Sequence, residues 1–133
     1  MRAVLDVNVL ISALISPAGA PARLVSQWLE GAFELVVSPA LVAEAQRTLA
    51  LPKLRARIER ADAERFIELL TDRADSVSDP EDPPAIRSSD PGDDYLLALA
   101  ASEQVALVSG DEHLLALRDR APIFSPREFL EQL

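Results

Sequence analysis

The chain contains no cysteine and only one histidine among its 133 residues. The absence of cysteine excludes a disulfide framework, a thiolate metal site and a cysteine nucleophile, and it is typical of proteins from a reducing compartment. No apolar run approaches the roughly 18 residues of a membrane span. Because Asp6 and Asn8 interrupt the first apolar run, we expect no signal peptide, no contact with a membrane and a cytoplasmic location.

Glycine is also scarce. The four glycines are scattered along the chain, so there is no glycine-rich loop that could cradle phosphate groups. We interpret the single histidine, His113, as a surface or helix-start residue rather than a catalytic base. Apolar residues, in contrast, make up 49% of the sequence, which is enough for the core of a single domain spanning residues 1–133.

Charge is distributed unevenly along the chain. The net charge of −9 has the wrong sign for a protein that binds nucleic acid over its whole surface. Five basic residues face one acid between Arg47 and Arg60, whereas seven acids face one arginine between Asp75 and Asp94. A metal-dependent enzyme that acts on a polyanion would have such a pattern, and so would a protein with two solvated faces.

Strand-like and helix-like segments alternate along the sequence. Short apolar runs predict strands over residues 2–5, 33–37, 105–108 and 122–124, and residues 75–78 form a weaker strand candidate. Helical spacing predicts helices over residues 6–16, 22–30, 39–51, 52–60, 63–73, 91–103, 112–118 and 126–133. The proline-rich segment 79–90 is predicted to be a loop. This alternation predicts a three-layer α/β domain built on a parallel sheet.

Asp6 lies where the first predicted strand stops and a helix begins. In open parallel sheets, ligands bind beyond the carboxyl ends of the strands, so an acid at this point is placed for chemistry. Aspartate is also a good helix N-cap. The sequence is compatible with both interpretations of Asp6.

Three further acids occupy comparable places. Asp111 follows the fourth predicted strand, and Asp94 lies on the early, inward face of the helix before that strand. Asp93 is expected to point about 100° away from Asp94, although both also favour a helix N-terminus. Glu44 borders the packing face of the helix after the second strand. If the first and fourth strands are neighbours, Asp6 and Asp111 face each other at the switch point of the sheet.

Four carboxylates in one pocket repel each other, and their pKa values rise unless a cation neutralises them. Sites rich in oxygen donors bind Mg²⁺ or Mn²⁺. Two such ions, about 3.5–4 Å apart, can activate water and stabilise an in-line displacement at phosphorus. Asn8 offers an amide suited to a metal-bound water or a phosphate oxygen.

Four segments together resemble the PIN-domain family, and most of all its toxin-type, VapC-like ribonucleases. They are VLDVNVLISA from Val4, SPALVAE from Ser38, DPGDDYLLA from Asp90 and LVSGDEHLL from Leu107. The set spans nearly the whole chain in the family's order. The resemblance implies an α/β/α domain with a five-stranded parallel sheet and Mg²⁺- or Mn²⁺-dependent cleavage of single-stranded RNA. It also implies frequent homodimers and, often, an antitoxin partner that blocks the site.

The resemblance also assigns roles to individual residues. It implies that the metal-binding and catalytic acids are Asp6, Glu44, Asp94 and Asp111. It implies accessory roles for Asn8, Asp93 and Ser109. For the ribonuclease that the resemblance implies, the local positive charge leads us to expect contacts with the RNA backbone from Arg47, Lys53, Arg55 and Arg57.

Two other functions fit the same sequence. The first is a non-catalytic binding module that keeps the fold and engages a protein through the acidic 75–90 segment. The second is a DNA flap-type nuclease, which would share the acids but usually carries long DNA-gripping insertions for which 133 residues leave no room. A phosphotransfer enzyme with an aspartyl nucleophile would need a second acid two residues after Asp6, where this chain has Asn8.

Overall fold

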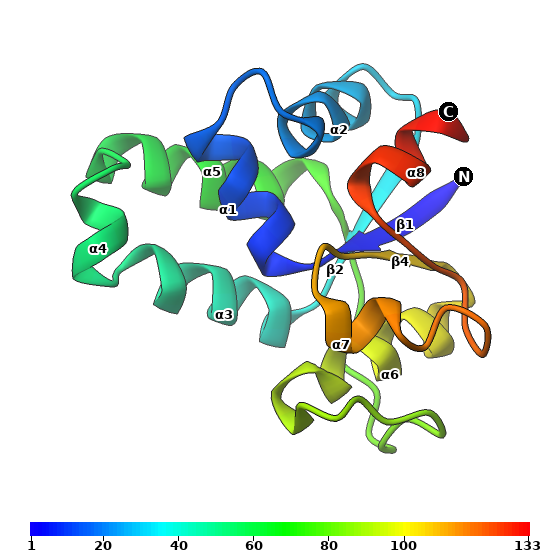
Figure 1. The fold of residues 1–133 in the computed structure, drawn as a ribbon. Helices are drawn as coiled ribbons and strands as arrows, with labels where there is room; N and C mark the ends of the chain where they lie inside the picture. Colours follow the sequence, from blue (N-terminus) through cyan, green and yellow to red (C-terminus); the bar gives the residue numbers. More distant parts are fainter.

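Five parallel strands form one sheet at the centre of the computed structural model, which describes residues 1–133 (Figure 1). The strands are β1 (Arg2–Leu5), β2 (Glu34–Val37), β3 (Asp75–Ser76), β4 (Ala106–Val108) and β5 (Ile123–Phe124). Their order in the sheet is β3-β2-β1-β4-β5, and every neighbouring pair is parallel. The predicted fold class is therefore confirmed.

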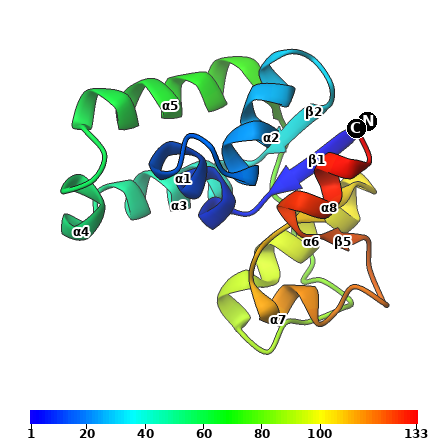
Figure 2. The same cartoon turned by 45° about the horizontal axis from the view of Figure 1, so that its top comes forward.

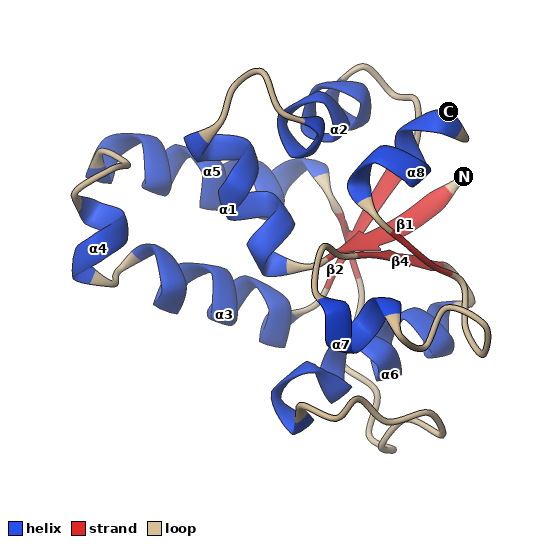
Figure 3. Cartoon of the chain, in the orientation of Figure 1, coloured by secondary structure: helices blue, strands red, loops and turns tan.

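Helices cover both faces of the sheet (Figure 3). The α-helices are α1 (Val7–Ile15), α2 (Ala20–Leu29), α3 (Pro39–Leu49), α4 (Pro52–Arg55), α5 (Arg60–Arg73), α6 (Asp94–Glu103), α7 (Glu112–Leu115) and α8 (Pro126–Glu131). In both ribbon views α2 and α8 lie together on one side of the sheet and α6 lies on the other (Figures 1 and 2). Because both faces are covered, the central strand β1 is apolar on both sides, and Ala3, Val4 and Leu5 are fully buried.

The order in which strands are added to the sheet changes side at β1, although all the strands stay parallel. Leu5 pairs with Val108 in the parallel register of these strands, and the Asp6 N–H continues the ladder by donating to the Val108 carbonyl at 2.9 Å. The strand after β1 is added on one side of it, and β4 is added on the other. The carboxyl ends of β1 and β4 thus form the switch point at which α/β sheets bind ligands.

Helices α3, α4 and α5 form an arm that extends away from the sheet (Figure 2). The predicted helix over residues 52–60 is shorter than expected, because α4 ends at Arg55. The N–H of Ile58 donates to the Leu54 carbonyl at 2.8 Å, and both side chains are buried. This apolar turn reverses the chain, so that α5 packs back along α3.

The helix predicted over residues 91–103 begins differently from the expectation. Residues Pro91–Asp93 form a 3₁₀ turn, and α6 proper starts at Asp94. The Asp90 side chain accepts from the Gly92 N–H at 3.0 Å, and the Asp93 N–H donates to the Asp90 carbonyl at 3.1 Å. A 3₁₀ turn is wound more tightly than an α-helix, so neighbouring side chains leave it in directions that an α-helical projection misplaces.

No single helix is long and apolar enough to cross a membrane. Helices α1 and α2 reach the required length and composition only when taken together, and they meet at an angle of 99°.

Candidate active site

Asp6 is both the cap of α1 and part of a buried polar cluster. One carboxylate oxygen accepts from the Asn8 N–H at 3.2 Å, and the other accepts from the Ser109 hydroxyl at 2.7 Å. Only 5% of Asp6 is exposed. The two interpretations of this residue are therefore compatible, since one oxygen caps the helix and the other faces the end of β4.

Ser109 joins the ends of the two central strands. Its fully buried hydroxyl donates to Asp6 and accepts from the Asp111 N–H at 3.0 Å. Asp111 in turn caps α7 by accepting from the His113 N–H at 2.8 Å. A single hydroxyl thus separates the Asp6 carboxylate from the backbone of Asp111, as expected if β1 and β4 are neighbours.

Asp93 is the third acid of this cluster. Burial, followed by the negative charges of Asp111, Asp6 and Asp90, raises the pKa of Asp93 from 3.8 to about 6. One of its carboxylate oxygens is buried without any hydrogen-bond partner. A buried acceptor of this kind is costly unless a proton or a cation satisfies it.

Asp94, which the sequence placed among the inward-facing acids, is bound by the preceding loop instead. Its carboxylate accepts from the Ser88 N–H at 2.9 Å and lies 3.7 Å from the Arg87 guanidinium. Both partners belong to the loop that precedes the helix. The loop therefore occupies the Asp94 carboxylate, whereas Asp93 lies close enough to Asp6 and Asp111 to feel their charges.

Electrostatics at the cluster favour a cation. Burial raises the pKa of Asp6, and the nearby charge of Asp111 adds to the rise, while the hydrogen bonds from Ser109 and Asn8 oppose it. No basic side chain is among the groups that shift the pKa of Asp6 or Asp93. The protein itself therefore does not neutralise these carboxylates.

Glu44 lies at the rim of the site rather than inside it. Its side chain is 39% exposed and forms an ion pair with Arg47, one turn further along α3. The predicted RNA contact Arg47 is thus occupied by Glu44. The other three basic residues take part in no ion pair, and they lie on and just after α4, namely Lys53, Arg55 and Arg57.

Tyr95 is a residue of the site that the sequence analysis missed. Burial raises its pKa well above 10.0, and the charges of Asp6, Glu44 and Asp93 raise it further. The phenol therefore lies among the three acids and stays protonated. It is the only tyrosine of the chain and directly follows the Asp93–Asp94 pair, a signal that could have drawn attention to it.

The donor set fits a divalent cation in its chemistry. Asp6 and the Asp111 backbone share the Ser109 hydroxyl, and the charges of Asp6 and Asp111 act on Asp93; hard cations prefer such carboxylate oxygens as ligands. The unpartnered Asp93 oxygen supports this fit. The side chains do not form a ready-made group of three metal ligands as they stand. His113 lies outside the set, because it is exposed and its Nδ1 is 2.7 Å from the Ser89 hydroxyl.

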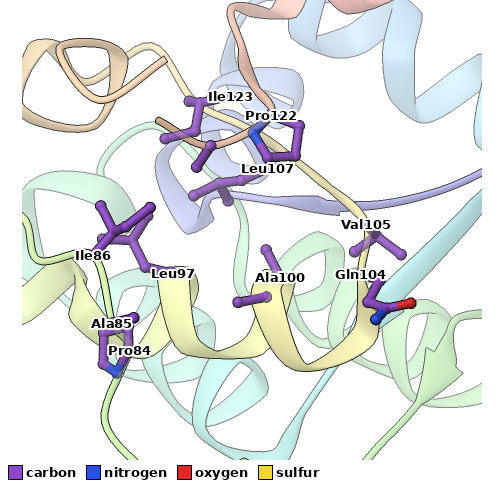
Figure 4. Close-up of a pocket in the computed structure, with 12 residues that line it drawn as sticks. Pro84, Ala85, Ile86, Leu97, Ala100, Gln104, Val105, Leu107, Pro122 and Ile123 are labelled. Atoms are coloured by element: carbon purple, nitrogen blue, oxygen red, sulfur yellow. The ribbon is translucent and has the colours of Figure 1, made fainter. Parts of the chain in front are cut away.

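A separate cavity of about 370 Å³ lies between the loop at Pro84–Ile86, helix α6 and strands β4 and β5 (Figure 4). Leu97 and Ala100 of α6 face Leu107 and Ile123 across it. Its lining is mostly apolar and contains no acid. The cavity therefore belongs to the packing of the loop on the domain and not to the acidic site.

The fold and the site define an α/β domain with a carboxylate cluster at the switch point of a parallel sheet. The sequence model of a known family, described as PIN domain, matches residues 2–113. The chain belongs to the PIN-domain family. PIN domains are generally nucleases that use divalent metal ions.

One relative with a similar sequence is the uncharacterized protein MJ1680 of Methanocaldococcus jannaschii, which is 28% identical over 144 residues, covering 99% of this chain and 91% of its own length. The fold is similar to that of PAE2754 from Pyrobaculum aerophilum, with a TM-score of 0.64, 18% identity and coverage of 98% of this chain and 88% of that chain. It is also similar to VapBC2 from Rickettsia felis bound to a DNA fragment from their promoter (TM-score 0.60, 14% identity) and to FitAcB from Neisseria gonorrhoeae (TM-score 0.58, 18% identity), each match covering 94% of this chain and 98% of the other.

Proposed function

We propose that this protein is a metal-dependent endoribonuclease that cleaves single-stranded RNA. The observation that supports this most strongly is the cluster of Asp6, Asp93 and Asp111 at the carboxyl ends of β1 and β4, with one buried Asp93 oxygen left without a partner. The chemistry of the cluster is suited to Mg²⁺ or Mn²⁺. Membership of a family of nucleases supports the reaction class.

The residues of the site have distinct tasks in this proposal. Asp6, Asp93 and Asp111 would hold the cation, which when bound activates water and stabilises charge on the phosphate. Ser109 fixes the direction of the Asp6 carboxylate through its hydrogen bond. Glu44, at the rim, orients the attacking water and takes up its proton. Of the acids expected from the sequence, Asp94 has a structural task instead, because it anchors the preceding loop.

RNA would reach the acids along the α3–α5 arm. Helix α3 has 11 residues and is therefore about 16 Å long. Glu44 lies at the middle of α3, about 8 Å from its end at Leu49. Beyond that end follow three cations that form no ion pair, Lys53, Arg55 and Arg57. Because these side chains lie on and after α4, beyond the end of α3, we assign them to the RNA backbone further along the strand.

A toxin–antitoxin role is part of the proposal. It is supported by the resemblance of the sequence to VapC-like ribonucleases and by the similarity of the fold to VapBC2 and FitAcB. We propose a cytoplasmic homodimer whose site is blocked by an antitoxin. Co-expression with the product of a neighbouring small gene would test this, since an antitoxin should co-purify and suppress cleavage.

The central experiment is cleavage of a fluorescently labelled single-stranded RNA with Mg²⁺ or Mn²⁺ and with a chelator. We expect metal-dependent cleavage that Asp6→Asn lowers by about 10²-fold or more. Asp119→Asn, which makes the same charge change at an exposed position away from the site, should behave like wild type. Equal cleavage with chelator, or full activity of Asp6→Asn, would refute the proposal.

One observation favours a second candidate, a non-catalytic binding module. The acids do not form a preassembled group of three ligands. A module of this kind would neither bind Mn²⁺ nor cleave RNA. Calorimetric titration with Mn²⁺ separates the two candidates, because the nuclease requires saturable binding that is lost in Asp6→Asn.

A further inference from the structure

A second cavity opens directly beside the acids and plays no part in the mechanism above. It has a volume of about 330 Å³ and is lined by residues from α1, the start of α2, the β4–α7 turn and the start of α8. Two of its lining residues, Asn8 and Asp111, also belong to the acidic site. This volume is at the lower end of the range of about 300–1,000 Å³ for ligand sites, so the cavity has room for a small group rather than a long chain. We call it the Gly110 cavity.

The polar groups in this cavity are free to bind a ligand. Asn8 and Ser12 are four residues apart on the exposed side of α1 and therefore lie one above the other. Hydrogen bonds in this part of the site run through Asp6, Ser109 and Asp111. They use the backbone N–H of Asn8 but leave its side-chain amide and the Ser12 hydroxyl without partners. An amide and a hydroxyl can together donate to and accept from a planar polar group.

The charge of the lining selects a neutral ligand. Asp111 is the only charged residue in the Gly110 cavity, and it is negative. A phosphate group would be repelled there. An uncharged group with polar edges and an apolar face would fit, because the rings of Pro21 and Pro126 also line the cavity. A nucleobase has these properties.

Gly110 itself is not required by the fold. Its φ is not in the left-handed region, and a Cβ built on it would meet no protein atom within 4 Å. Gly31, in contrast, has a φ of +88° and needs to be glycine for backbone reasons. The missing side chain at Gly110 keeps open a space between Asp111 and the cavity that only something from outside the chain would use.

We propose that the Gly110 cavity binds the nucleobase next to the phosphate that is cut and that Ser12 reads its polar edge. The inference deepens the proposed ribonuclease function, since the neighbouring acids would then hold the adjoining phosphate through the cation. It makes Ser12 a specificity-determining residue rather than a catalytic one.

The test uses the four ribonucleosides, which carry no phosphate and need no metal. Backbone amide resonances of the full chain are followed by NMR while each nucleoside is added to millimolar concentration. We expect the largest shifts at Val9, Ser12 and Gly110, and a preference among the four bases that Ser12→Ala changes. Gly110→Ala should weaken binding at least tenfold without lowering the melting temperature.

Gly31→Ala is the matched control, because it should lower the melting temperature and leave nucleoside binding unchanged. No shifts at these residues, or equal binding by Gly110→Ala, would overturn the inference. The outcome is independent of catalysis. If nucleosides bind but RNA is not cleaved, the ribonuclease proposal fails and the base site stands. If RNA is cleaved with the same base preference by wild type and Ser12→Ala, the base site fails and the ribonuclease proposal stands.

Discussion

Replacing the adjacent acids Asp93 and Asp94 by asparagine, one at a time, gives the sharpest test of the site. In Asp93→Asn the charge that Asp6 and Asp111 repel is removed, so we expect the metal-free protein to become more stable at pH 7.5. The pKa of Asp93 rises from 3.8 to about 6, and such a shift corresponds to at most about 3 kcal/mol. Because the side chain is only partly buried, solvent screening reduces this to ~1–2 kcal/mol. For a chain of this length, that raises the melting temperature by roughly 4–8 °C.

The gain should depend on pH in a defined direction. The folded state holds the Asp93 proton more tightly than the unfolded state, because the folded pKa is about 6 and the ordinary value is 3.8. The cost of charging Asp93, which comes from its burial and from repulsion by Asp111 and Asp6, is therefore absent below the lower value, grows as the pH rises between the two, and is complete above the higher one. The stability difference between Asp93→Asn and wild type should follow this course.

Mn²⁺ should reverse the order of stability. At a concentration of about 100 times Kd, a bound ion stabilises the folded state by about 2.7 kcal/mol. We expect this increment in wild type and in Asp94→Asn, and its loss in Asp93→Asn. Unfolding can be followed by calorimetry, or by the fluorescence of Trp28, the only tryptophan and a buried one. If Asp94→Asn loses the increment and Asp93→Asn keeps it, the assignment drawn from the structure is wrong.

Four shorter predictions follow from the same geometry. Mn²⁺ affinity, measured by calorimetry, should fall as the pH decreases through about 6, because a protonated Asp93 carboxyl group can no longer bind the ion. Ser109→Ala should lower the free energy of urea unfolding by about 1–3 kcal/mol, since it leaves a buried oxygen of Asp6 without its donor. Absorbance at 295 nm should show the single tyrosine, Tyr95, less than half ionised at pH 10.0, and a midpoint at that pH would contradict its burial among acids. Neutralising the three cations of the arm, Lys53, Arg55 and Arg57, should weaken RNA binding. It should also reduce the slope of log K against log salt by about 2, at ~0.7 per charge.

The fold could be predicted because its local and global signals agree. The three central strands β1, β2 and β4 are short and largely apolar and are mostly buried, and helices connect β1 to β2 and β2 to β3. The edge strand β3 is polar and has only a weak local signal. Parallel pairing follows from the alternation alone. The pairing of β1 with β4, which brings Asp6 and Ser109 together, could only be stated as a condition, since no local signal in either strand specifies its neighbour.

The choice between Asp93 and Asp94 could not be predicted because it depends on one turn of backbone. An α-helix that began at Pro91 would place Asp94 on the inward face with Leu97 and Ala98. The hydrogen bond from the Gly92 N–H to the Asp90 side chain instead sets a 3₁₀ turn before α6, and the Ser88 N–H then binds Asp94. Both interactions involve the loop, whose path no periodicity describes.

Helix capping and the proposed chemistry use the same residues for a physical reason. A helix cap requires a hydrogen-bond acceptor at the point where a strand ends and a helix begins. In a parallel sheet that point is also the ligand-binding edge. Asp6 and Asp111 each use one oxygen to hold a backbone N–H, which fixes the carboxylate and leaves its other oxygen to face the cluster. Asp93, by contrast, sits at the cap position of α6 without making a side-chain cap bond. Asp93 is therefore the acid of the three whose raised pKa is not offset by a cap hydrogen bond, and a bound cation would satisfy its unpartnered oxygen.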